Sequence, residues 1–331
     1  MIYDSVIYLK EFLAYVLIVL ALFPFGASAQ DTTTFTDSSS AAGLSDIGKL
    51  GEPAVWGDYN DDGWQDLLLS NTDPDIARRF SRNQRSRPHW IKTQKTFFFK
   101  NNGGKGFEEV SSLSGLPDIK LRAATWADFN NDGFPDLALA TVRASSPVKL
   151  YENSDGLYFT DVSDSAGITV DGSTANHVLW VDYNRDGFVD LFQPSLGVSY
   201  LYKNNGDGTF DEVSSKAGIA YKMYTNGAVW FDADNDGLPD LFLANGNFNK
   251  FYLNNGDGTL SDYSESAGLE GGPEWRTTSA CAGDYNGDGY LDLYITNIGR
   301  ARRNALYRNN GDRTFTDVTW ETGTDDVGDG R

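Results

Sequence analysis

The 331-residue chain has few of the residues that build most redox and transition-metal sites. It contains one cysteine, Cys281, and two histidines, His89 and His177. A single cysteine excludes an internal disulfide framework, and the scarcity of cysteine and histidine disfavours a zinc or copper centre. Rigidity and metal binding, if present, must come from other residues.

The same three residues give little support for catalysis, because no nucleophile motif accompanies them. We expect His177, at the start of a predicted strand, and His89, in an insertion, to have no catalytic role. Cys281 occupies an inner-strand position, so we predict a small, buried apolar residue there. Paired carboxylates could serve glycoside hydrolysis, but the repetition described below favours metal binding. We therefore expect the protein not to be an enzyme.

Long apolar runs are absent after the first 25 residues. The segment Phe12–Phe25 is almost wholly apolar and leads into Ala27-Ser28-Ala29. It is shorter than the roughly 20 residues that a membrane-spanning helix needs, and it ends in a small-x-small cleavage pattern. We predict a signal peptide at residues 1–29 and a secreted mature chain, 30–331, without a membrane span, placed in the periplasm or at the cell surface if the source is bacterial. A retained anchor and a buried helix are the alternatives.

Positive charge is scarce, with 27 Lys and Arg residues against 47 Asp and Glu and a net charge of -20. Such a chain repels nucleic acid and anionic membranes. Two insertions, Asp75–Lys95 and Ile298–Asn304, are instead rich in arginine. We consider them candidates for binding an anionic polysaccharide or acidic partner, with a solvated mobile loop as the alternative. The arginines to test are Arg78, Arg79, Arg82 and Arg85.

What the chain has in abundance is a nine-residue acidic loop. DYNDDGWQD at Asp58 is repeated as DFNNDGFPD, DYNRDGFVD, DADNDGLPD and DYNGDGYLD. The loops recur about every 50 residues, apart from one longer first interval, and a second element of the type LYKNNGDGTFDEV follows each in register. Periods of this size are typical of propeller blades. The repeats span about 51–116, 121–168, 175–219, 225–269 and 277–319.

Each repeat reads as four short strands, with the acidic loop between the first two and a Gly-rich hairpin between the last two. We therefore predict an all-β fold, a β-propeller of four-stranded antiparallel blades with five complete repeats. A further segment of the fourth-strand type, Thr34–Leu44, precedes them. It leaves two alternatives, an incomplete larger ring or a five-bladed ring with a spare strand. Trp56, Trp126, Trp180 and Trp230 precede four of the loops, and we expect them to pack between blades.

The alternation of oxygen-bearing residues within each loop predicts a hard-cation site. Side chains at positions 1, 3, 5 and 9, with the carbonyl of position 7, can converge on one point, and Gly at position 6 permits the turn. Oxygen-only ligands favour Ca²⁺ over Mg²⁺, with up to five ions. The predicted ligands are Asp58, Asn60, Asp62, Trp64 and Asp66; Asp128, Asn130, Asp132, Phe134 and Asp136; Asp182, Asn184, Asp186, Phe188 and Asp190; Asp232, Asp234, Asp236, Leu238 and Asp240; Asp284, Asn286, Asp288, Tyr290 and Asp292.

Two other interpretations of the loops are less favoured. Solvated acidic turns are common, but five copies in register argue against them. An EF-hand needs Glu at position 12 between two helices, and that position holds Leu69, Leu139, Gln193, Leu243 or Ile295.

Charge indicates what a bound cation would do. The predicted ligands include sixteen carboxylates, and five Ca²⁺ would change the net charge of the mature chain from -19 to about -9. We expect metal binding to contribute mainly to folding.

The loop D-x-[DN]-x-D-G-x-x-D, repeated with LYxNNGDGTFxDV, resembles the FG-GAP/VCBS repeat, and the fuller unit resembles cartilage acidic protein and its bacterial relatives. The resemblance covers about residues 34–323. It implies the Ca²⁺-bearing β-propeller found in integrin α subunits, secreted and used for adhesion or extracellular recognition of a protein or glycan. A lectin-like carbohydrate-binding propeller, and then a polysaccharide lyase or hydrolase, are the alternatives. The ligand and the oligomeric state are not indicated by the sequence.

Overall fold

The computed structural model describes residues 36–44, 50–71, 96–119, 121–141, 148–168, 174–272, 276–298 and 303–325. The chain divides into two units, Met1–Ser38 and Ser39–Arg331, and nearly all described residues belong to the second. The predicted signal peptide and the insertion Asp75–Lys95, with His89 and its arginines, lie outside the described residues. Within the described ranges, every helix is too short or too polar to cross a membrane.

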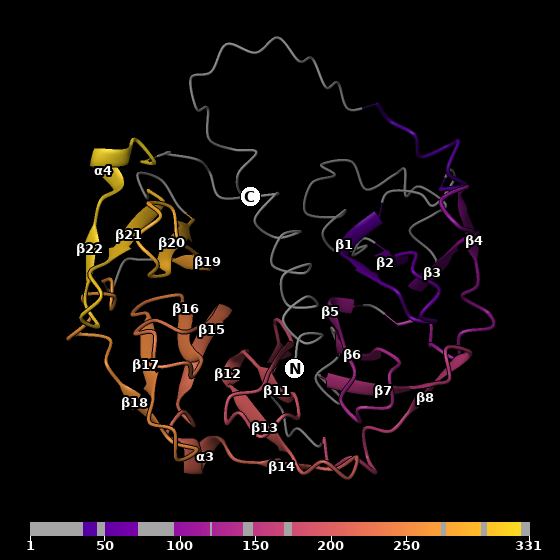
Figure 1. Cartoon of the computed structure of the whole chain (residues 1–331), viewed down its shortest axis with the longest axis horizontal. Coiled ribbons are helices and arrows are strands. Elements are labelled where there is room, and N and C mark those ends of the chain that lie inside the picture. Colours follow the sequence, from indigo (N-terminus) through magenta and orange to yellow (C-terminus); the bar gives the residue numbers. More distant parts are fainter. Residues whose placement is uncertain are drawn as a thin grey trace, which may run out of the picture. The chain divides into compact units, whose positions relative to one another are not determined.

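The second unit is built from antiparallel strands in five sheets, which follow one another in chain order (Figure 1). This confirms the all-β prediction and the four-stranded repeat. The first sheet contains β1 (Leu50–Gly57), β2 (Asp66–Asn71), β3 (Thr96–Asn101) and β4 (Phe107–Glu109). The second contains β5 (Leu121–Ala127), β6 (Asp136–Thr141), β7 (Val148–Ser154) and β8 (Tyr158–Asp161). The third contains β10 (Leu179–Val181), β11 (Asp190–Gln193), β13 (Tyr200–Asn204) and β14 (Phe210–Glu212).

The fourth sheet is larger than the repeat predicts. Its own strands are β15 (Lys222–Phe231), β16 (Asp240–Asn245), β17 (Lys250–Asn254) and β18 (Leu260–Asp262). Two strands of the third repeat, β12 (Ser195–Val198) and β9 (Thr174–Ala175), extend it to six in the order β18-β17-β16-β15-β12-β9. The fifth sheet contains β19 (Thr277–Gly283), β20 (Asp292–Asn297), β21 (Ala305–Asn309) and β22 (Phe315–Asp317).

The strand register fixes the position of every acidic loop. In the first sheet Gly57 pairs with Asp66, so the loop occupies the turn between β1 and β2 and its ninth residue begins β2. The same pairing closes the corresponding hairpin in the other four sheets. The residues at position 12 lie inside strands, as expected for a β-hairpin and not for an EF-hand.

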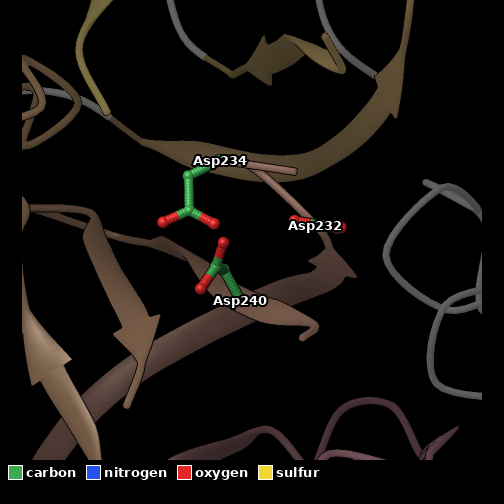
Figure 2. Close-up of side chains that lie close together, drawn as sticks. All are labelled: Asp232, Asp234 and Asp240. Carbon is green, nitrogen blue, oxygen red and sulfur yellow. The ribbon is translucent and has the colours of Figure 1, made fainter. Parts of the chain in front are cut away.

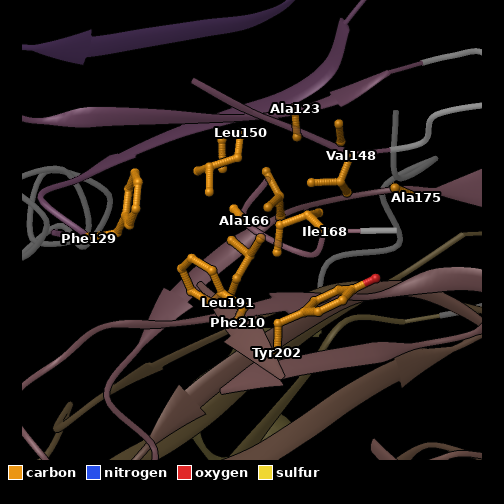
Figure 3. Packing of buried hydrophobic residues seen from close by; sticks show 13 residues of the cluster. Ala123, Phe129, Val148, Leu150, Ala166, Ile168, Ala175, Leu191, Tyr202 and Phe210 are labelled. Carbon is orange, nitrogen blue, oxygen red and sulfur yellow. The ribbon is translucent and has the colours of Figure 1, made fainter. Parts of the chain in front are cut away.

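The hydrophobic core lies between consecutive sheets. The second strands β6 and β16 are buried along their whole length, because both of their faces are covered by side chains of neighbouring sheets. Figure 3 shows one such layer, in which Leu150 and Val148 of the second sheet face Leu191 and Tyr202 of the third. Three further clusters join the first sheet to the second, the third to the fourth and the fourth to the fifth. Within the described residues no cluster joins the fifth sheet to the first, so closure of a ring stays a prediction.

A glycine turn after the fourth strand links each sheet to the next. The amide of Phe159 donates to Ser114 O at 2.7 Å, and equivalent bonds join Phe210 to Ala166 and Phe315 to Ala267. A Cβ at Gly115 would lie 2.4 Å from Phe159 O, so only glycine permits this approach. Single helical turns follow the fourth strand in the third and fifth sheets, α3 (Ser214–Ala217) and α4 (Thr319–Thr322), and each is followed by a left-handed glycine.

The segment before the first repeat supplies the same turn to the first sheet. Phe107 N donates to Ala42 O at 2.8 Å, and Leu44 packs against the cluster of Leu67, Leu69 and Phe99. Residues 36–44 form turns and no strand. The described part of Thr34–Leu44 therefore covers one face of the first sheet in the way that a preceding repeat would.

Two predictions about buried residues are wrong, and both concern the ends of the series. Trp126, Trp180 and Trp230 pack between sheets as expected, but Trp56 is 54 % exposed and contacts mainly Phe107. Cys281 is exposed, not buried. The reason is the same for both, because in the described residues no neighbouring sheet covers the outer face of the first or the fifth sheet.

Candidate metal centres

The backbone of each acidic loop folds so that its carboxylates accept the loop's own amides. The glycine at position 6 has a φ between 86° and 96° in all five loops, which confirms the predicted need for glycine there. The first aspartate accepts the amides of positions 5 and 6; Asp58, for example, binds Asp62 N at 3.1 Å and Gly63 N at 2.8 Å. The same two bonds form at Asp128, Asp182, Asp232 and Asp284.

The fifth position lies beside the seventh and third positions. Asp62 Oδ1 accepts Trp64 N at 3.0 Å, and Asp62 Oδ2 accepts Asn60 Nδ2 at 3.1 Å. The amide of position 7 makes this bond in all five loops. Hydrogen bonds thus connect positions 1, 3, 5 and 7 of the loop, while their role as metal ligands, that of the position-7 carbonyl included, stays a prediction.

The ninth position is the buried end of the loop. Asp66, Asp136, Asp190, Asp240 and Asp292 are at most 1 % exposed. In each, one oxygen accepts the amide of position 2, and the other accepts the amide of the asparagine that ends the third strand. The ninth carboxylate therefore joins the acidic loop to the third strand.

Burial raises the pKa of these carboxyl groups. The pKa of Asp66 is raised to about 6, and those of Asp136, Asp190 and Asp240 to about 7, chiefly by desolvation. The two backbone amides oppose this rise because they favour the charged form, and repulsion from the other loop carboxylates adds to it. The pKa of Asp292 is raised by the same causes.

The fourth loop brings its carboxylates closest together. One oxygen from each of Asp232, Asp234 and Asp240 lies within 4.8 Å of the others, and Asp240 is buried. Figure 2 shows the carboxylates of Asp234 and Asp240 pointing toward one another. Asp236, the fourth predicted carboxylate ligand of this loop, is not part of that group.

The other four loops carry asparagine at position 3, and one of these amides has an unpartnered oxygen. Asn60 Oδ1 is buried from solvent and accepts no hydrogen bond. In the second, third and fifth loops the equivalent oxygen accepts the amide of position 5 at 2.9 to 3.0 Å. A buried carbonyl oxygen without a donor is destabilising unless a donor or a cation satisfies it.

Cationic side chains contact three of the loops. Lys203 Nζ lies 3.0 Å from Asp186 Oδ2, and Lys100 Nζ lies 3.7 Å from Asp62 Oδ2. Both lysines come from the third strand of their own sheet. Arg313, from the fifth sheet, donates through Nε to Asp234 Oδ2 of the fourth loop at 2.8 Å. The sequence analysis did not identify these three residues.

A row of asparagines connects the loops of consecutive sheets. These residues, too, were not predicted from the sequence. Asn254 Nδ2 donates to Pro239 O of its own loop at 3.0 Å and to Tyr183 O of the preceding loop at 2.7 Å. Equivalent pairs of bonds are made by Asn153, Asn204 and Asn309. The signal was the invariant first asparagine of the NNGDG-type turn within this chain. Each of the first four loops is therefore held by the sheet that follows it.

The remaining sequence candidates are not brought into these sites. His177 is exposed and precedes β10. Arg303 is the only arginine of the Ile298–Asn304 insertion that lies in the described residues; it pairs with Asp325 and stacks on the Trp320 ring at 3.9 Å. The proposed anionic-ligand loops therefore stay largely untested.

Two of the solved structures that this chain resembles have low sequence identity to it. A lectin from Agrocybe aegerita, described as recognising non-reducing terminal N-acetylglucosamine, is 20 % identical with a TM-score of 0.47, over 80 % of this chain and 64 % of that one. The V. cholerae biofilm matrix protein Bap1 is 15 % identical with a TM-score of 0.41, over 79 % of this chain and 38 % of that one. This chain thus spans less than two thirds of either protein.

No curated protein sequence matches the chain. A family model does: the FG-GAP-like repeat matches residues 128–193, 195–243 and 232–295. These ranges contain the second to fifth acidic loops. The chain belongs to the FG-GAP-like repeat family.

Proposed function

We propose that the protein is an extracellular, calcium-stabilised β-propeller that serves as a non-catalytic adhesion or recognition scaffold. Its membership of the FG-GAP-like repeat family supports the repeat architecture. The sheets succeed one another in chain order with cores between them, as blades of a propeller do. The proposal extends this arrangement to a closed or larger ring.

The observation that carries the metal proposal is the fourth loop, where one oxygen from each of three carboxylates lies within 4.8 Å of the others. Three like charges at this separation repel each other strongly in a partly buried site. The orphaned Asn60 Oδ1 in the first loop is an independent sign of an unsatisfied oxygen. The donor set is oxygen only, which suits Ca²⁺ and not zinc or copper. The residues present therefore fit a calcium ion.

Each loop residue would have a distinct task. Side chains at positions 1, 3, 5 and 9 and the carbonyl at position 7 would supply ligand oxygens, and the ninth aspartate would also connect the site to the third strand. The backbone amides already engage some lone pairs of each carboxylate, but a carboxylate offers about four acceptor sites, so others stay available. A bound calcium ion would supply two positive charges that offset the repulsion within a loop.

The asparagine row gives metal binding a structural consequence. Asn254 contacts two loops at once, the fourth through Pro239 O and the third through Tyr183 O. Ordering one loop therefore restrains the loop of the preceding sheet. In this proposal the cations replace the disulfides that a chain with one cysteine cannot form.

Export through the predicted signal peptide would place the protein where calcium is plentiful. The described residues around the loops carry no nucleophile with a paired base, which is why the proposed role is binding. The partner would be an extracellular protein or glycan, and the arginine-rich insertions are the candidate contact for an anionic one. Loss of adhesion to immobilised matrix glycans or proteins in EGTA, with recovery in calcium chloride, would support this role.

Isothermal titration of purified protein with calcium chloride tests the metal proposal directly. We expect up to five ions per chain, and one fewer in the Asp232→Asn/Asp240→Asn variant. The matched control is Asp207→Asn/Asp257→Asn, which removes two acidic charges from exposed turns outside the loops. Its stoichiometry should equal that of the wild type. Absence of calcium binding by the wild type would refute the proposal.

A further inference from the structure

The fourth loop and the fifth sheet each differ from the repeat pattern at one position, and the side chains at these two positions are hydrogen-bonded to each other. Position 3 is asparagine in four loops and Asp234 in the fourth. The turn between the last two strands reads NNGDG in the third and fourth repeats but NNGDR in the fifth, which places Arg313 where the others have glycine. Arg313 Nε donates to Asp234 Oδ2 at 2.8 Å, across 79 residues of sequence.

Arg313 occupies this position in an unfavourable backbone conformation. Its φ is 72°, in the left-handed region where Gly208 and Gly258 have a φ of 84°. A non-glycine residue there is strained. An exposed ion pair contributes little stability on average, and the Arg313 side chain is 52 % exposed. General stabilisation of the fold is therefore a weak explanation for an arginine at this turn.

The environment of Asp234 gives a better explanation. Its side chain is 9 % exposed and its carboxylate lies in the group with Asp232 and Asp240. The first and third loops receive a lysine from the third strand of their own sheet, but the equivalent residue in the fourth sheet is Leu253. The fourth loop holds four carboxylates, and two guanidinium groups lie next to it: Arg313, which binds Asp234, and Arg185, which lies beside Gly237.

We propose that Arg313 is a resident counter-ion of the fourth loop that lowers this site's affinity for a divalent cation. This inference rests on the proposed calcium binding and concerns its regulation at one site. In the absence of metal the guanidinium holds Asp234 and offsets the repulsion within the group. When a cation enters, the same guanidinium repels it and occupies an acceptor site of one of its ligands. The fourth site thereby binds more weakly than its four carboxylates alone would dictate.

Calcium titration calorimetry of four proteins tests this inference: the wild type, Arg313→Gln, Asp234→Asn and the double variant. We expect Arg313→Gln to tighten one site about tenfold, equivalent to about 1.4 kcal/mol. The same substitution should have no effect in the Asp234→Asn background. Arg313→Gly, which restores the glycine found at this position in the third and fourth repeats, should tighten the site equally. Lys250→Gln removes a positive charge paired with Asp262, away from the loops, and should leave every site unchanged.

A second measurement separates electrostatics from misfolding. In EGTA, Arg313→Gln should unfold at a lower urea concentration than the wild type, and saturating calcium should remove this difference. Affinity within twofold of the wild type in Arg313→Gln, or tightening that persists without Asp234, would overturn the inference while the proposed function stands. If the wild type binds no calcium, the proposed function fails, and this inference fails with it.

Discussion

Replacing Asn254 by alanine isolates the contact that joins one acidic loop to the next sheet. The buried side chain donates to Tyr183 O at 2.7 Å and to Pro239 O at 3.0 Å, and its Oδ1 accepts Gly256 N at 3.0 Å. The backbone amide of Asn254, which binds Asp240, is untouched by the substitution. The change therefore removes three hydrogen bonds without altering a predicted metal ligand.

The expected loss follows from those three bonds. A hydrogen bond contributes about 1 kcal/mol net, and a buried group left unpaired costs about 1 to 3 kcal/mol. Asn254 is only 6 % exposed, so water replaces its bonds poorly. We expect Asn254→Ala to lower the free energy of unfolding by about 3 to 4 kcal/mol.

Asn101 provides the matched control, because it holds the same place in the first sheet without a preceding loop to bind. Its Nδ2 donates to Gln65 O at 3.0 Å and its Oδ1 accepts Gly104 N at 2.8 Å, and both bonds are exposed. Asn101→Ala should therefore cost about 1 kcal/mol, since water can satisfy the groups it leaves. The difference between the two variants reports the buried bond between sheets.

The measurement is urea unfolding, followed by circular dichroism and tryptophan fluorescence at one saturating calcium concentration. Coincident transitions by the two probes are needed before free energies are compared. Equal losses in Asn254→Ala and Asn101→Ala, or a loss below about 1 kcal/mol in Asn254→Ala, would refute the reasoning.

Three other predictions use different features of the fold. In EGTA, stability should fall as the pH rises from about 4 to 7, because burial raises the pKa of Asp66 to about 6 and those of Asp136, Asp190 and Asp240 to about 7, so that ionisation over this range disfavours the folded state. Urea midpoints across this range check the prediction, and a rise would contradict it. Gly115→Ala should destabilise the protein by about 2 kcal/mol more than Gly208→Ala, because both residues have a positive φ but only at Gly115 would a Cβ lie against a carbonyl oxygen. Equal thermal midpoints of the two variants would count against the glycine link between sheets. Cys281 should react with a thiol reagent in the native state, and protection until denaturation would show that its face is covered.

The sequence predicts the strands and loops well because the repeat makes the same demands at each copy. Gly63, Gly133 and their equivalents have the positive φ that the turn requires, and the apolar run after each loop becomes a buried strand. These features depend on local chemistry, so one strand and one loop are enough to predict them.

The features that the sequence did not predict depend on contacts between repeats. Asn254 and Tyr183 are 71 residues apart, and Arg313 and Asp234 are 79 residues apart. Cys281 and Trp56 resemble inner positions in sequence, but their exposure depends on whether another sheet covers them. The pairing of β12 and β9 with the fourth sheet is likewise a contact between repeats. Periodicity alone does not determine these contacts.

The central claim, that cations neutralise the acidic loops and hold the sheets together, is tested most directly by thermal unfolding with and without calcium. The account predicts a clearly lower midpoint in excess EGTA than in millimolar calcium chloride, with recovery when calcium is added back in excess. An identical midpoint in both solutions would contradict it.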